Sequence, residues 1–302
     1  MPEGATGSAP PAAPQKPLEQ VLGELRPRLH RYCARMTGSV IDGEDVVQET
    51  MLKVIEATPA AGAIANPEGW LFRIVHHAAL DFLRRRARQE IPCSDEDLDM
   101  IAAAKSSIEE RQIAAAGLAT FMRLPAAQRS SVILSDALGY SLQEIGEIVG
   151  GSAPAVKGAL QRGRARLRAL AAEPDDAPVA ALSEPERARL KAYIERFNTH
   201  DFDAVRAMLA QDVRLKLVNR LRLDGKASVA PYFGNYASRP HWRLAPGFVD
   251  RRPAALVYDG DDPDRRMKYF VLLNWADGRV VAIRDFVFAR YAMDGAELVA
   301  MD

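Results

Sequence analysis

The chain has 302 residues, enough for two or three domains, and its hydrophobic content of 48% is ample for packed cores. Its 40 basic and 40 acidic side chains give a formal net charge of zero, which taken alone argues against a nucleic-acid-binding protein. The charges are segregated, however, into a basic cluster at residues 84–88 and an acidic one at 95–99. The sequence contains no signal peptide and no apolar run of about 18 residues, which predicts a cytoplasmic protein without a membrane segment.

The two cysteines, Cys33 and Cys93, lie far apart and have no His or Cys neighbour at metal-ligand spacing. This favours buried or incidental thiols over a disulfide bond or a metal site. We find no motif for a metal ion or an organic cofactor, and we expect neither.

In chain order, residues 1–17 are rich in Ala, Pro and Gly, which predicts a disordered tail. An all-helical domain is expected over residues 18–92, with its second helix from Asp42 to about Ala57 and its third from Pro67 to Arg88. Residues 57–66, between these helices, are expected to form a loop. The acidic segment that follows, residues 93–106, is a poor helix former and is expected to be a linker.

A second helical block, residues 107–172, ends in a pattern typical of a helix-turn-helix. Ser141 followed by Glu144 is a capping box, which predicts the start of the first helix. Gly146 supplies the small residue that two closely crossing helices need, and Gly150 supplies the left-handed turn residue.

The second helix of this motif is expected to begin at the N-cap Ser152 and to pack through Val156. It has five basic side chains and no acidic one. A solvated basic face is the ordinary explanation of a single charge run, but the preceding helix-turn-helix spacing favours DNA binding. The side chains expected to face DNA are Ser152, Lys157, Gln161, Arg162, Arg164 and Arg168.

Within this set, Lys157, Gln161 and Arg162 are expected to read bases with help from Ser152, because Arg and Lys suit guanine edges and Gln suits adenine. The remaining arginines are expected to contact phosphates and set the register.

After a linker at residues 173–182, the pattern changes to that of an α+β domain over residues 183–302. Two helices, Glu184–Thr199 and Asp203–Ala210, precede the strands. The runs that resemble strands are 213–218, 242–250, 254–260, 267–275 and 279–291. We expect them to form an antiparallel sheet.

Residues 18–172 resemble an extracytoplasmic-function (ECF) sigma factor, a bacterial transcription initiation factor with two all-α sigma domains. Three motifs carry this resemblance, namely DGEDVVQETMLKV (42–54), EGWLFRIVHHAALDFLRRR (68–86) and the segment 124–167. In that order they look like the helix that docks on the clamp helices of the RNA polymerase β′ subunit, the promoter −10 helix and sigma domain 4.

The resemblance implies that residues 18–92 form sigma domain 2 and residues 107–172 form sigma domain 4. It assigns Asp45, Gln48 and Glu49 to polymerase binding, although these residues alone would indicate only a solvated helix face.

The same resemblance assigns −10 recognition to the third helix, where rings suit unpaired bases and arginines suit phosphates. The residues concerned are Trp70, His76, His77, Arg84 and Arg85. His77 departs from the asparagine usual in the family, and loop 57–66 lacks the aromatic and charged groups expected of a segment that captures a flipped base. The acidic linker is either a solvated tether or a segment that threads the polymerase channel.

Residues 183–302 resemble a SnoaL-like domain, the cone-shaped α+β fold shared with polyketide cyclases, ketosteroid isomerases and nuclear transport factors. The segments 197–217 and 223–233 and the closing strands carry this resemblance. The fold hosts enzymes, binding proteins and dimerisation modules alike. The groups available for catalysis are His200, Asp201, His241, Tyr269 and Asp285, but they form no motif that demands chemistry, and helix capping explains Asp201 better.

We therefore expect a transcription initiation factor rather than an enzyme, with promoter DNA and core RNA polymerase, through its β′ clamp helices and β subunit, as partners. The cone is expected to regulate the sigma domains in cis. Two alternatives stay open: a repressor that senses a ligand, such as a small apolar molecule in the cone, and a sigma factor whose cone is an enzyme. The docking helix favours the initiation factor, because a repressor has no need of it.

Overall fold

The protein is represented by a computed structural model, which describes residues 18–57, 64, 66–89, 117–171 and 181–301. The predicted tail at residues 1–17 and the acidic linker at 93–106 lie outside these residues. Most of the loop at 57–66 and of the linker at 173–182 also lie outside them.

Three long helices form the first part of the molecule: α1 (Leu18–Thr37), α2 (Val40–Ala57) and α3 (Pro67–Gln89). Their apolar stripes meet in a common core, in which Leu29 and Val47 have no exposed surface. The second and third helices begin and end within about two residues of the sequence prediction, because their apolar positions recur at helical spacing.

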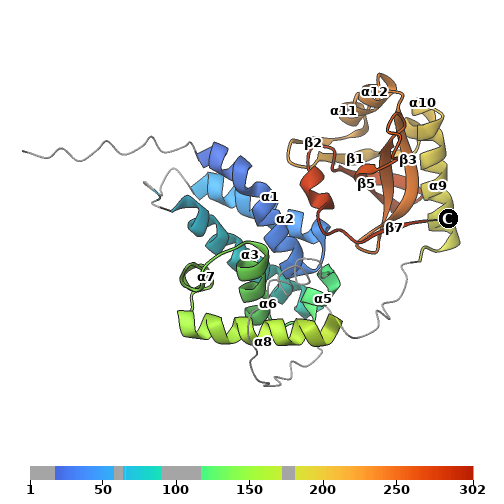
Figure 1. Ribbon diagram of the computed structural model, residues 1–302. Coiled ribbons are helices and arrows are strands. Elements are labelled where there is room, and N and C mark those ends of the chain that lie inside the picture. Colours follow the sequence, from blue (N-terminus) through green and yellow to red (C-terminus); the bar gives the residue numbers. More distant parts are fainter. Residues whose placement is uncertain (1–17, 58–63, 65, 90–116, 172–180, 302) are drawn as a thin grey trace, which may run out of the picture.

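The next part consists of four short helical segments followed by one long helix, and its described residues begin at Gly117. These helices are α5 (Leu118–Met122), α6 (Ala126–Val132), the π-helical turn η2 (Ile133–Ala137), α7 (Leu142–Val149) and α8 (Ala153–Ala171). In Figure 1, α8 lies along the lower edge of the molecule, beneath α6 and α7.

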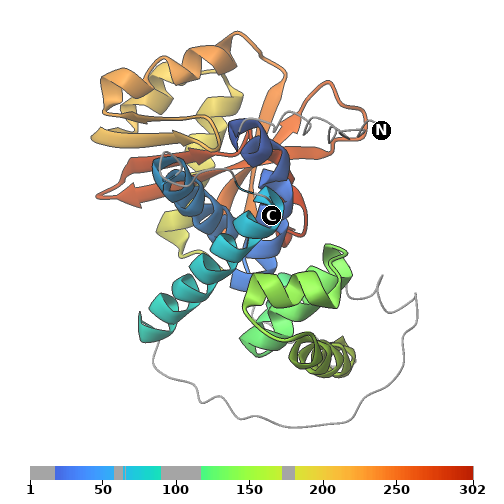
Figure 2. The same ribbon diagram turned by 90° about the vertical axis from the view of Figure 1, so that its left-hand side faces the viewer.

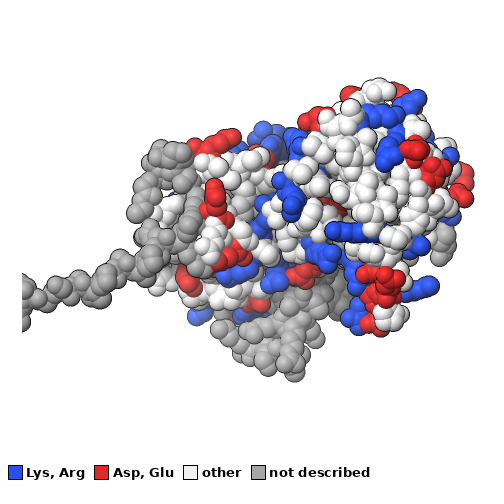
Figure 3. All heavy atoms as spheres, turned by 90° about the horizontal axis from the view of Figure 1, so that it is seen from above, with Lys and Arg blue, Asp and Glu red and all other residues white. Residues whose placement is uncertain are grey.

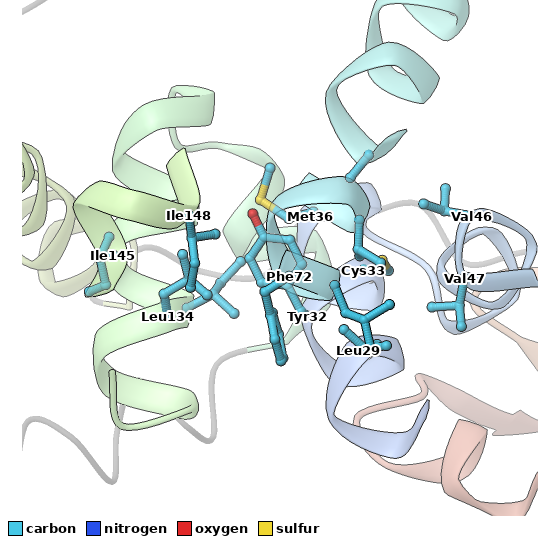
Figure 4. Close-up of a cluster of buried hydrophobic side chains, with 14 of the residues drawn as sticks. Leu29, Tyr32, Cys33, Met36, Val46, Val47, Phe72, Leu134, Ile145 and Ile148 are labelled. Atoms are coloured by element: carbon cyan, nitrogen blue, oxygen red, sulfur yellow. The ribbon is translucent and has the colours of Figure 1, made fainter. Parts of the chain in front are cut away.

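The two helical parts share one continuous hydrophobic core. Figure 4 shows Tyr32 and Phe72 between the α1–α2 side of this core and Leu134 and Ile148 from the second part. Tyr32 and Phe72 are fully buried, and Phe72 packs edge-on against the ring of Tyr140 at a centroid distance of 5.2 Å. The two parts are thus in close contact in this structure.

The third part combines helices with a seven-stranded sheet of order β2-β1-β6-β5-β4-β3-β7. Its helices are α9 (Glu184–Asn198), α10 (Phe202–Ala207), α11 (Lys226–Val229), α12 (Tyr232–Ala237) and the 3-10 turn η3 (Arg290–Met293). Its strands are β1 (Leu209–Leu217), β2 (Leu221–Asp224), β3 (Trp242–Val249), β4 (Arg252–Asp259), β5 (Met267–Ala276), β6 (Arg279–Asp285) and β7 (Leu298–Ala300).

The sheet differs from the predicted one in several respects. The strands β2 and β7 were not predicted, and β1 begins at Leu209, so the helix expected over Asp203–Ala210 ends earlier, at Ala207. The sheet is mixed rather than purely antiparallel, because β1 pairs with β6 in parallel. The strand expected over residues 279–291 ends at Asp285, after which Phe286 and Ala289 are buried in a turn that leads to η3. Apolar residues in a buried turn have the same composition as a strand, which explains the error.

Each face of this sheet is covered. Helices α9, α10 and α12 pack on one face to form the cone interior. Against the other face lies the corner between α1 and α2, where Ala34, Val40 and Ile41 join a core with Leu256 and Phe270 of the sheet. Figures 1 and 2 show this junction, with α1 and α2 beside the strands. The cone is therefore attached to the first helical part through a buried apolar contact.

Candidate functional site

The helix-turn-helix has the local geometry that its sequence predicts. Ser141 accepts a hydrogen bond from the Glu144 amide at 3.3 Å, and the Glu144 carboxylate accepts one from the Ser141 amide at 2.8 Å, which completes the capping box. Gly150 has a φ of 75° in the left-handed region, and Val156 is buried between the helices.

Gly146 needs its small size for a reason other than the predicted one. A Cβ atom there would lie 2.7 Å from the carbonyl oxygen of Gly151, so the turn, rather than the facing helix, excludes a side chain. The close approach between helices occurs at Gly163, where a Cβ atom would lie 2.7 Å from Cγ2 of Val132 on α6. Sequence spacing identified the motif but missed this crossing point.

The predicted DNA-facing side chains of α8 divide into two groups. Lys157, Arg162 and Arg168 are exposed, whereas Gln161 is half-buried. Ser152 caps the helix, because its Oγ accepts a hydrogen bond from the Ala155 amide at 3.4 Å. Lys157 and Arg168 form a cationic surface along one side of α8, whereas Arg162 lies about 140° around the helix from Lys157.

Arg164 does not belong to that surface. Its side chain is 14% exposed and forms a two-point ion pair with Asp136 of η2, whose side chain is 1% exposed. The expectation that Arg164 faces DNA is therefore wrong for this structure. The helical spacing placed it correctly beside Lys157 and Arg168 but carried no information about the carboxylate on the neighbouring turn.

The residues predicted to read the −10 element lie along α3 with different exposures. His77, Arg84 and Arg85 are exposed, and Trp70 packs partly against the core. His76, whose ring was expected to be available to unpaired bases, is instead buried, and its Nδ1 lies 2.7 Å from the hydroxyl of Tyr32. Burial lowers the pKa of His76 to about 4, which keeps the ring neutral.

A groove of about 610 Å³ lies between α3, α6 and the start of α8. Its lining from α3 includes His76 and Arg84, and the other side is formed by α6, by Gly151 of the turn and by Ala155 of α8. The predicted −10 surface therefore borders this groove, close to where α3 and α7 are in contact, whereas the exposed cations of α8 do not line it.

Polar contacts hold the helical parts together at this groove. The buried Arg129 of α6 donates hydrogen bonds to the carbonyl of Met36, at the end of α1, at 2.6 Å and to that of Leu124 at 2.8 Å. Glu68 of α3 accepts hydrogen bonds from Arg28 of α1 and from the hydroxyl of Tyr140. The hydrogen bonds from Arg129 to Met36 and from Tyr140 to Glu68 must break before the two parts can separate.

The face of α2 that contains the predicted polymerase contacts extends further than the sequence suggested. Asp45, Gln48 and Glu49 are half-buried, and the same helical face continues to Leu52 and Ile55, whose exposed fractions are 56% and 52%. These two apolar residues were missed, because a sequence pattern does not show which apolar residues of a helix face solvent. Exposed apolar residues of this size indicate a surface that meets a partner.

The acidic end of this face is covered by the cone. Asp45, which we expected to be exposed, has a side chain 42% exposed and accepts two hydrogen bonds from Arg284 of β6, at 2.7 and 3.0 Å. Lys216 of β1 lies 3.2 Å from the same carboxylate. Burial lowers the pKa of Lys216, and the charge of Arg284 acts in the same direction. The N-terminal end of α2 is thus occupied by cations of the cone.

A second carboxylate, Asp42, makes a similar contact. Its side chain is 9% exposed and lies 2.6 Å from Arg252 of β4 and 3.6 Å from Arg86 of α3. The Asp250 carboxylate of the cone accepts a hydrogen bond from the Val40 amide at 2.6 Å and so caps the start of α2. The cone therefore satisfies a backbone group that helix α2 would otherwise leave unpaired.

Tyr291 of η3 anchors the cone to α1 and α2. Its hydroxyl accepts a hydrogen bond from Arg26 at 2.6 Å and donates one to Glu44 at 3.0 Å, and its ring packs edge-on against His30. Arg26 also pairs with the fully buried Glu44. Burial lowers the pKa of His30, so this ring remains neutral near physiological pH.

The cone interior contains a buried polar cluster rather than a free catalytic group. The Asp285 carboxylate accepts hydrogen bonds from the hydroxyls of Tyr232 and Tyr236, both at 2.7 Å, and from the Val287 amide at 2.8 Å. Since Tyr236 already donates to Asp285, the Tyr269 hydroxyl donates to Tyr236 at 3.0 Å. Burial raises the pKa of Asp285, whereas these hydrogen bonds act to lower it.

The remaining groups considered for catalysis lie elsewhere. Asp201 caps α10, where it accepts a hydrogen bond from the Ala204 amide at 3.0 Å, as the sequence predicted. His200 lies at the preceding helix-helix turn, and His241 lines a surface hollow of about 820 Å³ beside Tyr258. These residues do not converge on the Asp285 cluster.

Among the described residues, no group of three or more His, Cys, Asp and Glu side chains is arranged to hold a metal ion. Cys33 is a buried free thiol whose pKa is raised by burial, and Cys93 lies outside the described residues. Of the helices that the structure describes, none is both long and apolar enough to span a membrane.

Comparison with known families gives two matches. The family model "Sigma-70 region 2" matches residues 22–89, which include most of α1 and all of α2 and α3. The model "Sigma-70, region 4" matches residues 118–167, from α5 into α8.

Several known proteins are similar to the chain. The ECF RNA polymerase sigma factor SigE of Mycolicibacterium smegmatis is 31% identical over 154 residues, which make up 50% of this chain and 60% of SigE. The ECF RNA polymerase sigma factor SigM of Mycobacterium tuberculosis is 32% identical over 154 residues, or 51% of this chain and 76% of SigM. The crystal structure of SigJ of M. tuberculosis, an extracytoplasmic function sigma factor, matches 89% of this chain and 95% of its own, with 20% identity and a TM-score of 0.35.

Proposed function

The chain belongs to the ECF sigma factors of RNA polymerase, and we propose from this premise that it binds core RNA polymerase and directs transcription from specific promoters. In this proposal α3 contacts the −10 element and α8 contacts the −35 element. The exposed cations of α8 support the second assignment, since Lys157 and Arg162 lie on the helix that a helix-turn-helix protein inserts into the major groove.

The surface on α2 supports polymerase binding. Gln48, Leu52 and Ile55 present a mixed polar and apolar stripe of the kind found at the centre of protein interfaces. A repressor that acts by binding DNA alone has no use for this stripe, so the initiation factor is the better assignment.

The cone acts on this surface in cis, and the contact that carries this part of the proposal is the pairing of Asp45 with Arg284 and Lys216. Polymerase and the cone cannot bind the carboxylate of Asp45 at the same time. The cone therefore inhibits the free protein by covering the acidic end of α2, and docking on polymerase releases it. Its effective concentration is high, because the linker at 173–182 keeps it near the helices.

ECF sigma factors as a family act in transcription and are not enzymes. We extend this to the cone of the present chain. Asp285 is fully buried and accepts hydrogen bonds from Tyr232, Tyr236 and a backbone amide, which supports a structural role for this carboxylate. The cluster is proposed to hold the cone together, and no apolar ligand is required to satisfy it.

The central experiment is run-off transcription on fragments of genomic DNA with core polymerase and the full chain, followed by mapping of the transcript ends. A shared sequence upstream of the starts, spaced as −10 and −35 elements, is expected. A variant that frees Asp45, Arg284→Ala with Lys216→Ala, is tested beside the wild type. The proposal fails if neither protein co-purifies with core polymerase and neither yields specific transcripts.

A further inference from the structure

Three cations stand side by side across neighbouring strands at one corner of the cone. In the sheet register, Lys216 of β1 is opposite Arg222 of β2 and also pairs with Arg284 of β6. Like charges placed directly opposite each other destabilise a sheet. Arg214, two residues before Lys216, points to the same face of the sheet. Arg214 is opposite Asp224 of β2. The unfavourable like-charge contacts are therefore those of Lys216 with Arg222 and Arg284, and an anion beside them would offset their repulsion.

The carboxylates of α2 meet only part of this charge. Asp45 pairs with Arg284 and Lys216, whereas Arg214 and Arg222 are exposed and form no ion pair with a described residue. Arg220, in the turn between β1 and β2, is also exposed, with its guanidinium over the ring of Phe288 at 4.5 Å. We call Arg214, Arg220 and Arg222 the β1–β2 arginines.

If this corner existed only to hold Asp45, the bidentate contact from Arg284 would be sufficient. The β1–β2 arginines add positive charge beyond that contact, and this additional charge is exposed to solvent. Such a surplus indicates a partner with repeated negative charges.

The corner adjoins the basic end of α3. Asp42 of α2 pairs with Arg86 of α3. Asp45, about one helical turn further along α2, pairs with Arg284 and Lys216 of the corner, so α2 links the two sets of cations. Figure 3 shows Lys and Arg side chains gathered where the helical part meets the cone. A polyanion that follows the arginines of α3 can therefore continue onto the cone.

We propose that the β1–β2 arginines contact the phosphate backbone of DNA and extend the DNA-binding surface of α3 onto the cone. This inference rests on the proposed function, in which α3 binds promoter DNA. Arginine suits the assignment because its planar group can donate two hydrogen bonds to one phosphate. A backbone contact of this kind adds affinity and positions the protein without reading bases.

The test measures binding of the full chain to a mixed-sequence 30-base-pair duplex over a series of salt concentrations. The variant is Arg214→Ala with Arg222→Ala. Its matched control is Arg265→Ala with Arg266→Ala, which removes the same charge from exposed positions between β4 and β5. The first pair should weaken binding at low salt and reduce the slope of log K against log salt by about 0.9 for each phosphate that the protein no longer neutralises, whereas the control should match the wild type.

Equal affinity and equal slope for wild type and variant, with unchanged thermal melts, would overturn the inference. So would a variant that binds DNA normally but binds core polymerase more weakly, since that result assigns the arginines to an acidic protein surface. Failure of the proposed function gives a different result, because the wild-type chain itself would then not bind the duplex.

Discussion

Arg284 of β6 donates a hydrogen bond to each carboxylate oxygen of Asp45, from Nη1 at 3.0 Å and from Nη2 at 2.7 Å. Two parallel hydrogen bonds between a guanidinium and a carboxylate fix both the distance and the orientation of the groups. Through this pair, the position of the cone is set by a residue proposed to bind polymerase.

Replacing Arg284 and Lys216 with alanine should increase the affinity of the full chain for core polymerase several-fold. The free wild-type protein must first undock the cone, and this step reduces its apparent affinity in proportion to the undocked fraction. Titration of a fluorescently labelled chain with core polymerase measures the change. The variant Arg265→Ala with Arg266→Ala serves as the control, and an unchanged or lower affinity for the Arg284 and Lys216 variant would refute cis inhibition.

Lys157→Ala and Arg162→Ala should relax the preference for the −35 sequence, with the removal of each base contact costing about 1–3 kcal/mol on the matched promoter. Arg168→Ala should instead weaken binding evenly on matched and mismatched DNA and flatten the salt dependence. Electrophoretic mobility shifts with paired duplexes separate these results. Equal losses for all three variants on both duplexes would mean that α8 holds phosphates and reads no bases.

Arg164→Ala should destabilise the protein rather than alter sequence preference. Removal of the guanidinium leaves the carboxylate of Asp136, whose side chain is 1% exposed, without its partner, at a cost of about 3 kcal/mol. Chemical denaturation followed by circular dichroism measures this loss. The exposed Arg168→Ala is the matched control, and a melt for Arg164→Ala equal to that of the wild type would show that the pair contributes nothing.

His76 should make the helical core sensitive to acid. Its pKa is about 4 in the folded protein, against an ordinary value of 6.5, so the unfolded chain binds the proton first as the pH falls. The stability from a neutral His76 is complete above pH 6.5 and is lost progressively toward pH 4, by about 3 kcal/mol if the whole shift is expressed. Denaturation at several pH values should show a smaller decline for His76→Gln, and identical pH profiles would contradict the assignment.

Gly163→Ala and Gly158→Ala should have opposite effects although both lie in α8. A methyl group at Gly163 would lie 2.7 Å from Cγ2 of Val132 and 3.2 Å from a backbone oxygen, a conflict that costs about 1–3 kcal/mol. At Gly158 the nearest atom is 3.4 Å away on a flexible arginine, and the gain in helix propensity is up to about 1 kcal/mol. Thermal melts of the two variants test this, and destabilisation by both would show that Gly163 is not a special contact.

The features that sequence predicted well depend on neighbours a few residues apart. The capping box of Ser141 and Glu144 and the left-handed Gly150 are local signals, and the structure contains both. The helices α2 and α3 follow in the same way from apolar residues at helical spacing.

The features that sequence missed depend on residues far apart in the chain. Asp45 and Arg284 are separated by 239 positions, and no periodicity connects them. Likewise, a helical projection places Arg164 on the cationic side of α8, but only the folded structure brings Asp136 beside it. The parallel pairing of β1 with β6 was missed for the same reason, since strands predicted one after another suggest antiparallel neighbours.

Asp42 belongs at once to two partners, Arg86 on α3 and Arg252 on the cone. A phosphate that takes Arg86 withdraws one cation from this carboxylate and leaves Arg252 as its remaining counter-charge, which changes the free energy with which the cone stays attached. Thermodynamic linkage makes the effect reciprocal, so attachment of the cone must change the affinity of α3 for phosphate by the same factor. One shared carboxylate is thus sufficient to make the two equilibria interdependent.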